Sequence, residues 1–347
     1  MWNDHCYCKG ELESYILKIQ MSGIRDIGIE IREKFSPSKE KLIRILEKYK
    51  NLNGVCGAVM ISTCNRTEVY ISVNENYSYN VSEILCNFFE QDYSKYEEYF
   101  FEKEEEIAFE HLCLVGSGLQ SQIFGDDQII TQVREALEYS RLHEFTDGFL
   151  ETFFRIAISS AKEIKTKVIL KDQRDNSAPY KAILKLKELC NLENQNILVI
   201  GNGQMGRLAS ELLIKEKSNV VTTLREYRKG IVQIPNGVST IPYTNRYEVV
   251  EQATIVISAT TSLHHTIRYE DIIKLRSIPQ IIVDLAVPRD IDPMIKALDI
   301  NLLTIDDLGD KDQKLSSEII QTIDRVVDTH TTKYYKWVDY KRRMIKL

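Results

Sequence analysis

Residues 196–215 constrain the fold of this chain more than any other stretch. They are a buried-strand run, NILVI, then a glycine turn, GNGQMG, then an amphipathic helix, RLASELLIK. This order of elements is typical of a dinucleotide-binding unit. Gly201 permits the tight turn, Gly203 lets the backbone approach a pyrophosphate, and Gly206 allows close helix–strand packing. The N–H groups at the helix start favour an anion. A glycine turn that binds nothing is the alternative.

The following strand distinguishes between the two nicotinamide cofactors. An NAD site has an acidic residue near the end of this strand, which holds the ribose 2′-hydroxyl. Here the strand ends at Arg225, and Arg228 and Lys229 come soon after it. Cations at this place suit a 2′-phosphate, so the sequence favours NADP(H).

Strands and helices alternate to about residue 310. TIVISA at 254–259, QIIVDLAV at 280–287 and LLTIDDL at 302–308 are further strand runs. This alternation predicts a parallel sheet with helices on both faces and ligands at the carboxyl ends of the strands. The expected fold class is α/β. An α+β N-terminal catalytic domain precedes a Rossmann-type, doubly wound NADP-binding domain and a C-terminal helix.

The N-terminal half contains a candidate nucleophile. Residues 59–73, VMISTCNRTEVYISV, are two strand-like runs broken by STCNR. The break places Cys64 at a strand end beside Thr63, Asn65 and Arg66. A thiol is nucleophilic as the thiolate, which a neighbouring cation favours. An isolated cysteine is also commonly a small buried hydrophobic residue, so the residues alone leave both interpretations open.

A histidine and a polar run follow in residues 107–143, which show two helical patterns around a glycine-containing turn. His111, early in the first helix, is either a packed helix histidine or a general acid–base near pH 7. Asp126, Asp127 and Gln128 precede the second helix, where side-chain oxygens can cap N–H groups.

Composition describes an ordinary globular chain of 347 residues, 43% hydrophobic and 28% charged. The formal net charge of −6 gives no global basic field, so a nucleic-acid ligand would need a local basic patch. No apolar run has the length of a membrane span, and no signal-peptide core is present. Seven cysteines without disulfide-framework spacing suit a reducing cytoplasm. No metal site is expected, because Cys6 and Cys8 have no partner pair downstream.

Domain bounds follow from these patterns. We expect an extension at 1–14, a catalytic and substrate domain at 15–170, a linker and connecting helix at 171–190, the NADP(H)-binding domain at 191–310 and a helical tail at 311–347. KDQRDNSAP is polar, aperiodic and contains a proline, as boundaries often do. Ser36 and Pro37 should occupy the N-cap and N1 positions of a helix. EKEEE at 102–106 should be a solvated helix start or loop.

Five ordered blocks resemble the glutamyl-tRNA reductase family over about residues 15–340. They are ISTCNRTEVY, HLCLVGSGLQSQIFGDDQIITQVREAL, ILVIGNGQMGRLA, ATIVISATTS and IIVDLAVPRDIDP. The resemblance implies an NADPH-dependent reduction of glutamyl-tRNA to glutamate-1-semialdehyde, which begins tetrapyrrole (5-aminolevulinate) synthesis. The Cys64 thiolate would attack the aminoacyl ester, release tRNA and hold a thioester for reduction by hydride.

The resemblance also implies roles for individual residues. Cys64 and His111 are the expected catalytic residues, and Thr63 and Arg66 are expected to recognise the glutamyl group. The full expected substrate-binding set is Thr63, Asn65, Arg66, Ser121, Asp126, Asp127, Gln128 and Gln132. The expected cofactor-binding set is Gly201, Asn202, Gly203, Gln204, Met205, Gly206, Arg225, Ser258, Ala259 and Thr260.

The chain departs from the family pattern at several places. GDDQ at 125–128 stands where the family usually has Gly-Glu before Gln, and GIRDIG replaces an Asn-His-Lys-Thr-like run. The linker TKVILKDQRDNSAPY is strongly altered, and YYKWVDYKRR resembles only the beginning of the family's C-terminal dimerisation domain. The resemblance therefore leaves open a homodimer and the docking of a partner, glutamate-1-semialdehyde aminomutase.

Three hypotheses of function follow. The first is a glutamyl-tRNA reductase of shortened type. The second is a divergent relative that binds glutamyl-tRNA or a pathway enzyme without turnover, which the altered linker favours and the intact Cys64, Arg66 and His111 oppose. The third is an NADP-dependent reductase of another aminoacyl ester or thioester, for which a preference for a non-acidic amino acid would be diagnostic.

Overall fold

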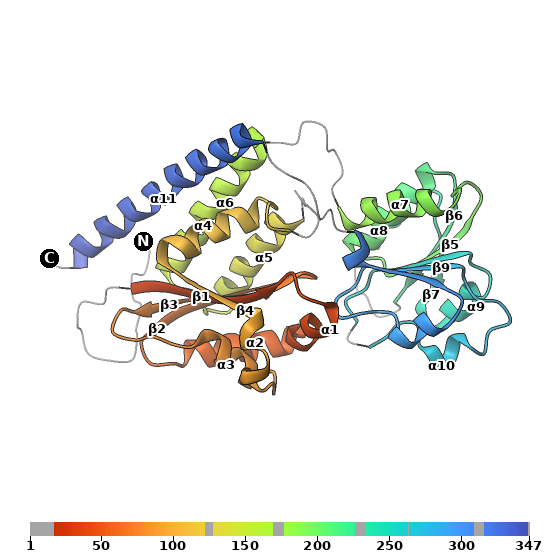
Figure 1. Ribbon diagram of the computed structural model, residues 1–347, viewed down its shortest axis with the longest axis horizontal. Helices are drawn as coiled ribbons and strands as arrows, with labels where there is room; N and C mark the ends of the chain where they lie inside the picture. Colours follow the sequence, from red (N-terminus) through yellow and green to blue (C-terminus); the bar gives the residue numbers. More distant parts are fainter. Residues whose placement is uncertain are drawn as a thin grey trace. The chain divides into compact units, whose positions relative to one another are not determined.

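The computed structural model describes residues 17–121, 128–168, 177–225, 233–262, 264–308 and 316–345 (Figure 1). The chain divides into two compact units. Unit 1 joins Met1–Arg174 to Asp312–Leu347, and unit 2 is Asp175–Lys311. Unit 2 is thus an insertion in the chain of unit 1.

Unit 1 contains a four-stranded antiparallel sheet in the order β2-β3-β1-β4. Its strands are β1 (Leu17–Arg25), β2 (Val55–Ser62), β3 (Arg66–Asn74) and β4 (Phe100–Glu104). The EKEEE run meets the expectation in part, because its last two residues begin a helix, whereas its first three complete β4. β4 is an edge strand, and charged side chains on an edge oppose pairing with other chains.

Helices cover both faces of this sheet (Figure 1). One face carries α2 (Lys39–Lys50) and α3 (Val81–Phe88); the other carries α4 (Glu105–Gly116), α5 (Ile129–Leu142) and α6 (Gly148–Val168). Side chains alternate between the two faces of a strand. Ile61 and Tyr70 accordingly join the α4–α6 core, while Met60 and Val69 join the other. Short helices complete this part: α1 (Ile29–Arg32), η1 (Glu33–Phe35), η2 (Tyr93–Lys95) and η3 (Glu97–Tyr99).

The start of α2 corrects one expectation. The N-cap residue is Ser38, whose Oγ accepts a hydrogen bond from the N–H of Lys41 at 3.1 Å, and not Ser36. Ser36 instead ends η1 in an extended conformation. The serine that caps a helix is the one whose oxygen reaches an N–H of the first turn, and two nearby serines cannot be distinguished by composition.

The C-terminal helix α11 (Ser317–Ile345) belongs to unit 1, where it packs along α6. Tyr334 is 1% exposed and stacks on Phe109, with ring centroids 5.4 Å apart. His330 Nε2 lies 2.9 Å from Glu163 Oε2 on α6. The expected helical tail therefore supplies part of the core of unit 1.

Unit 2 contains a six-stranded parallel sheet in the order β10-β9-β8-β5-β6-β7. The strands are β5 (Asn196–Ile200), β6 (Asn219–Leu224), β7 (Ser239–Pro242), β8 (Ile255–Ser258), β9 (Ile281–Asp284) and β10 (Asn301–Thr304). From the β7 edge this is the strand order of a Rossmann fold, in which the direction of winding reverses between the first and fourth strands. Here those strands are β5 and β8, so ligands are expected where these two end. The α/β expectation is confirmed.

Helices cover both faces of the parallel sheet (Figure 1). The pair α7 (Ala178–Leu189) and α8 (Gln204–Lys215) lies on one face, and α9 (Arg246–Val250) and α10 (Tyr269–Ile272) lie on the other. Leu198 and Val256 of the central strands pack with Val250 and Ile272 on the second face. Short helices are η4 (Tyr243–Asn245), η5 (Pro293–Ala297) and η6 (Ile305–Leu308).

The cysteines differ in oxidation state. Cys86, Cys113 and Cys190 carry thiols, as does Cys64. Cys56 is disulfide-bonded, which departs from the expectation of a fully reduced set. Within the described ranges, no helix has the length and apolarity needed to cross a membrane.

Candidate active site

The turn between β2 and β3 holds Cys64. Thr63 closes the turn, since its N–H donates to the Arg66 carbonyl at 2.9 Å. Its Oγ1 also accepts from the N–H of Asn65 at 3.2 Å and of Arg66 at 3.3 Å. Cys64 itself is half-buried, and Asn65 and Arg66 are buried. The turn is therefore fixed by its own neighbours, with Thr63 acting on the backbone.

Arg32, a residue that the sequence did not single out, braces the same turn. Its Nη1 donates to the carbonyl of Cys64 at 2.6 Å and to Oδ1 of Asn65 at 3.2 Å. The amide of Asn65 donates onward to Asp26 Oδ1 at 2.9 Å. A guanidinium thus lies beside Cys64, and the amide of Asn65 is held between a cation and a carboxylate.

Arg66 lies differently from the expected open carboxylate receptor. It is 2% exposed, and its Nη1 is 2.8 Å from Oε1 of Glu68. Its Nη2 donates to the carbonyl of Gln120. Part of its guanidinium therefore serves the fold, because a buried cation needs an anionic or carbonyl partner. Binding of a substrate carboxylate by Arg66 stays a prediction.

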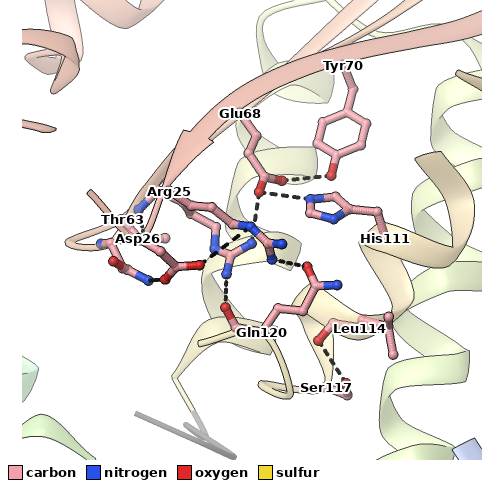
Figure 2. A network of polar contacts seen from close by, with 11 residues as sticks. Arg25, Asp26, Thr63, Glu68, Tyr70, His111, Leu114, Ser117 and Gln120 are labelled. Carbon is pink, nitrogen blue, oxygen red and sulfur yellow. Dashed lines mark hydrogen bonds and ion pairs between the residues drawn. The ribbon is translucent and has the colours of Figure 1, made fainter. Parts of the chain in front are cut away.

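Glu68 is the centre of this network and was missed in the sequence (Figure 2). Its carboxylate is fully buried and binds Arg66, His111 Nε2 at 3.0 Å and the Tyr70 hydroxyl at 2.8 Å. Burial by itself would raise the pKa of Glu68. The positive charges of His111 and Arg66, with the hydrogen bonds from His111 and Tyr70, outweigh burial and lower that pKa to about 2. Glu68 is therefore an anion that orients its neighbours.

His111 lies on α4 and is 2% exposed. Because a carboxylate only accepts hydrogen bonds, the contact with Glu68 assigns a proton to Nε2. The other ring nitrogen, Nδ1, is buried and has no hydrogen-bond partner among the described residues. The ring edge meets Phe101, with centroids 5.1 Å apart. In the neutral ring, Nδ1 is the nitrogen with an available lone pair.

The remaining expected substrate residues lie on the loop after α4 and at the start of α5. Ser121 is half-buried and follows Gln120, whose Oε1 accepts from Arg25 and whose carbonyl accepts from Arg66. Gln128 is the N-cap residue of α5, without a side-chain capping bond, and Gln132 is one turn further on. Asp126 and Asp127 lie outside the described residues. The expected capping of α5 by Gln128 is therefore not seen.

The glycine turn of unit 2 has the form that the sequence indicates. Gly201 has a φ of +105°, and a Cβ there would lie 2.6 Å from the carbonyl oxygen of Ala259. A Cβ on Gly206 would lie 1.9 Å from the carbonyl oxygen of Gly201. A Cβ on Gly203 would meet no atom within 4 Å. Two of the glycines thus serve packing, and the third faces open space.

That open space lies at the N-terminus of α8. Gly203 is the N-cap residue and offers no side-chain oxygen to the N–H groups that follow it, at Gln204 and Met205. Asn202 instead turns its amide toward the carbonyl of Gln233 at 3.1 Å. A helix N-terminus without a side-chain cap, at the switch point of a parallel sheet, fits the pyrophosphate of a dinucleotide.

The loop after β8 packs against this turn, since Ala259 and Thr260 are nearest to a Cβ placed on Gly201. The hydroxyl of Ser258 is fully buried and donates to Asp290 Oδ2 at 2.8 Å, so Ser258 serves to fix the loop. Thr260 donates to Asp290 through its N–H at 2.8 Å and its hydroxyl at 2.6 Å. Asp290 and its buried neighbour Asp284 were also missed in the sequence. Burial raises the pKa of Asp290, and burial together with Asp290 raises the pKa of Asp284 to about 8.

Among the described residues, no group of three or more His, Cys, Asp and Glu side chains has a geometry suited to a metal ion. Unit 1 contains a cysteine turn and a buried histidine, and unit 2 contains a glycine turn that fits a dinucleotide. Together these features define a dehydrogenase-type enzyme. A family model of shikimate/quinate 5-dehydrogenase matches residues 183–310, and a nicotinamide cofactor is consistent with both observations.

Comparison with known proteins identifies the family. The model of the glutamyl-tRNA(Glu) reductase N-terminal domain matches residues 23–168. A glutamyl-tRNA reductase of Alkaliphilus oremlandii is 40% identical over 329 residues, 94% of this chain and 98% of the relative. One of Acetivibrio thermocellus is 40% identical over 320 residues, 91% and 95% of the two chains. The chain belongs to the glutamyl-tRNA reductase family, which confirms the resemblance seen in the sequence.

A solved structure also matches this chain. The glutamyl-tRNA reductase of Methanopyrus kandleri aligns with 94% of this chain and 79% of its own, at 24% identity and a TM-score of 0.41.

Proposed function

We propose that this protein reduces glutamyl-tRNA(Glu) to glutamate-1-semialdehyde with NADPH, through a thioester on Cys64, in the cytoplasm. Membership of the family supports the reaction class. The observation that carries the assignment is Arg66, which joins the Cys64 turn to the buried Glu68–His111 pair. One contiguous network thus links the candidate nucleophile with a candidate acid–base.

The residues of unit 1 suit acyl transfer. The Cys64 sulfur would attack the ester carbonyl of the aminoacyl-tRNA, forming a thioester and breaking the bond to the ribose oxygen. His111 Nδ1, which is not used by the described part of the fold, would take the proton of the Cys64 thiol and pass it to that ribose oxygen. Glu68 holds the ring in place through its contact with Nε2. Bound NADPH would supply the hydride that reduces the thioester to the aldehyde.

The residues of unit 2 suit NADPH in particular. The N–H groups of Gln204 and Met205 would hold the pyrophosphate, and Arg225, exposed at the end of β6, would hold the 2′-phosphate. Ala259 and Thr260 pack against the glycine turn at Gly201. The homodimer and the aminomutase partner stay predictions, which sedimentation of the protein alone and with the aminomutase would test.

The thioester test uses charged tRNA without NADPH. The unmodified protein should accumulate a hydroxylamine-labile glutamyl adduct, and added NADPH should convert it to semialdehyde. Cys64→Ser should form no adduct. Cys190→Ser, a change at another half-buried thiol, should behave as the unmodified protein does.

Other outcomes would support the alternatives. Semialdehyde production by Cys64→Ser would refute the thioester. Tight binding of tRNA and NADPH without turnover would indicate a binding protein. A preference for a non-acidic aminoacyl-tRNA would indicate another reductase and remove the substrate role of Arg66.

A further inference from the structure

Two residues lie side by side where β6 and β7 end. These strands pair in parallel, and Leu224 of β6 is in register with Pro242 of β7. Arg225 follows Leu224, and Tyr243 follows Pro242, so both project from the carboxyl edge of the sheet. The ligand-binding edge of a doubly wound sheet is this one.

The Arg225 guanidinium lies over the ring of Tyr243, 5.5 Å from the ring centroid. This distance is within the range of a cation–π contact. Arg225 is exposed, and no hydrogen bond or ion pair joins it to another described residue. The ring of Tyr243 is therefore a packing contact that restrains the Arg225 guanidinium, whose positive charge also acts on the Asp290 carboxylate.

Tyr243 is itself held from another side. The guanidinium of Arg246 lies 4.3 Å from the Tyr243 ring centroid and 4.6 Å from that of Tyr247. Arg246 donates through Nε to the Thr266 carbonyl at 2.7 Å and through Nη1 to the Tyr243 carbonyl at 3.2 Å. A cation bound to two carbonyls has a fixed position, so it orients the ring that Arg225 contacts.

The same edge is tied to the glycine turn. The N–H of Gly201 donates to Thr223 Oγ1 at 3.1 Å, and Thr223 is two residues before Arg225. A pyrophosphate at the start of α8 places the adenosine ribose toward the end of the second strand of the unit, which is β6 here. Arg225 is therefore at the place of the ribose 2′ position.

We propose that Tyr243 is a positioning residue for cofactor selection, which holds Arg225 against its ring where a ribose 2′-phosphate binds. This inference rests on the proposed use of NADPH and adds the residue that orders the phosphate-binding cation. A planar guanidinium restrained before binding loses less conformational freedom when it grips a phosphate.

The test compares two nucleotides that differ by the 2′-phosphate alone, 2′,5′-ADP and 5′-AMP. Their dissociation constants are measured by titration calorimetry on the full chain, and their ratio reports 2′-phosphate recognition. Arg225→Ala should reduce the preference for 2′,5′-ADP by about tenfold or more, since a charge-assisted contact is lost. Tyr243→Leu should reduce it about two- to fivefold. Tyr243→Phe, which keeps the ring, should retain it.

A double mutant separates positioning from a direct contact. If Tyr243 acts through Arg225, Tyr243→Leu should have no further effect on the ratio in the Arg225→Ala background. Equal weakening of both nucleotides by Tyr243→Leu, or effects of the two changes that add, would overturn the inference. Thermal unfolding of each variant monitors the fold.

The outcome also separates this inference from the proposed function. No preference for 2′,5′-ADP in the unmodified protein would refute NADPH use, and the inference with it. A preference that falls with Arg225→Ala and survives Tyr243→Leu would refute the positioning role alone.

Discussion

His111 Nε2 lies 3.0 Å from Oε1 of Glu68, and the two side chains are 1% and 0% exposed. Arg66 shares the same carboxylate oxygen at 2.8 Å. One buried anion therefore serves two potential cations from different elements, β3 and α4. Burying a carboxylate costs free energy, and deleting it costs more stability still, because its buried partners lose the charge that compensates them.

Glu68→Gln should destabilise the protein by roughly 3–5 kcal/mol, because it leaves buried cationic groups without their anion. Urea unfolding at pH 7 measures this change. Glu75→Gln, at an exposed position near the end of the same hairpin, should change stability by less than about 0.5 kcal/mol. Equal stability of the two variants would contradict the central role of Glu68.

The lowered pKa of Glu68 predicts acid sensitivity of unit 1. The folded-state pKa of about 2 is below the ordinary value of 4.5, so the unfolded chain binds the proton more tightly. The contribution is complete above pH 4.5 and is lost as the pH falls toward about 2. Urea midpoints measured through this range should fall steeply for the unmodified protein and less steeply for Glu68→Gln.

Asp284 predicts the opposite slope at higher pH. Burial, with Asp290 beside it, raises its pKa from 3.8 to about 8, so the folded state binds the proton more tightly. Its contribution is complete below pH 3.8 and is lost as the pH rises toward 8, by at most ~1.4 kcal/mol per pH unit. Asp284→Asn should flatten the dependence of the urea midpoint between pH 5 and 8. An unchanged slope would assign the pH dependence to other groups.

Two glycines of the same turn should respond differently to alanine. Gly206→Ala places a Cβ 1.9 Å from the Gly201 carbonyl oxygen, so α8 must move away from β5 and the protein should lose several kcal/mol. Gly203→Ala meets no protein atom within 4 Å and should alter stability by less than about 1 kcal/mol. Gly203→Ala should nevertheless weaken nucleotide binding, measured by calorimetry, because the methyl group enters the space assigned to the pyrophosphate. Unchanged affinity would place the pyrophosphate elsewhere.

Two tyrosines of α11 form a matched pair. Tyr334 is 1% exposed between Phe109 and Phe153, whereas Tyr340 is 58% exposed. Tyr334→Ala should cost roughly 3–5 kcal/mol in unfolding free energy, and Tyr340→Ala less than about 0.5 kcal/mol. Similar effects in a thermal or urea melt would mean that α11 does not contribute to the core as its contacts indicate.

The parts that sequence predicts well here are local. GNGQMG runs directly into its helix, and residues 63–65 join the two strands of the hairpin, so adjacent residues specify each turn. In the sequence, Glu68 looks like an ordinary polar residue of an alternating strand. Its partner His111 is 43 positions away, so no local pattern connects the two residues. Asp290 likewise holds Ser258, which is 32 positions earlier.

The position of an edge strand, and the surface against which a helix packs, also depend on residues far away in the sequence. β4 is short and acidic, and it becomes a strand because β1, far earlier in the chain, offers it an open edge. The apolar stripe of α11 predicts a helix with a buried face, but nothing in its residues names α6 as the surface that it meets.

The return of α11 to unit 1 has a consequence during biosynthesis. Residues 175–311 emerge from the ribosome as one uninterrupted segment, so unit 2 can complete its fold while translation continues. Unit 1 cannot complete its core by then, because Tyr334 and Val338 of that core follow unit 2 in the chain. The nascent chain must therefore expose the apolar residues of α4 and α6 that α11 covers until α11 has emerged, and chaperone binding would protect it most during that interval.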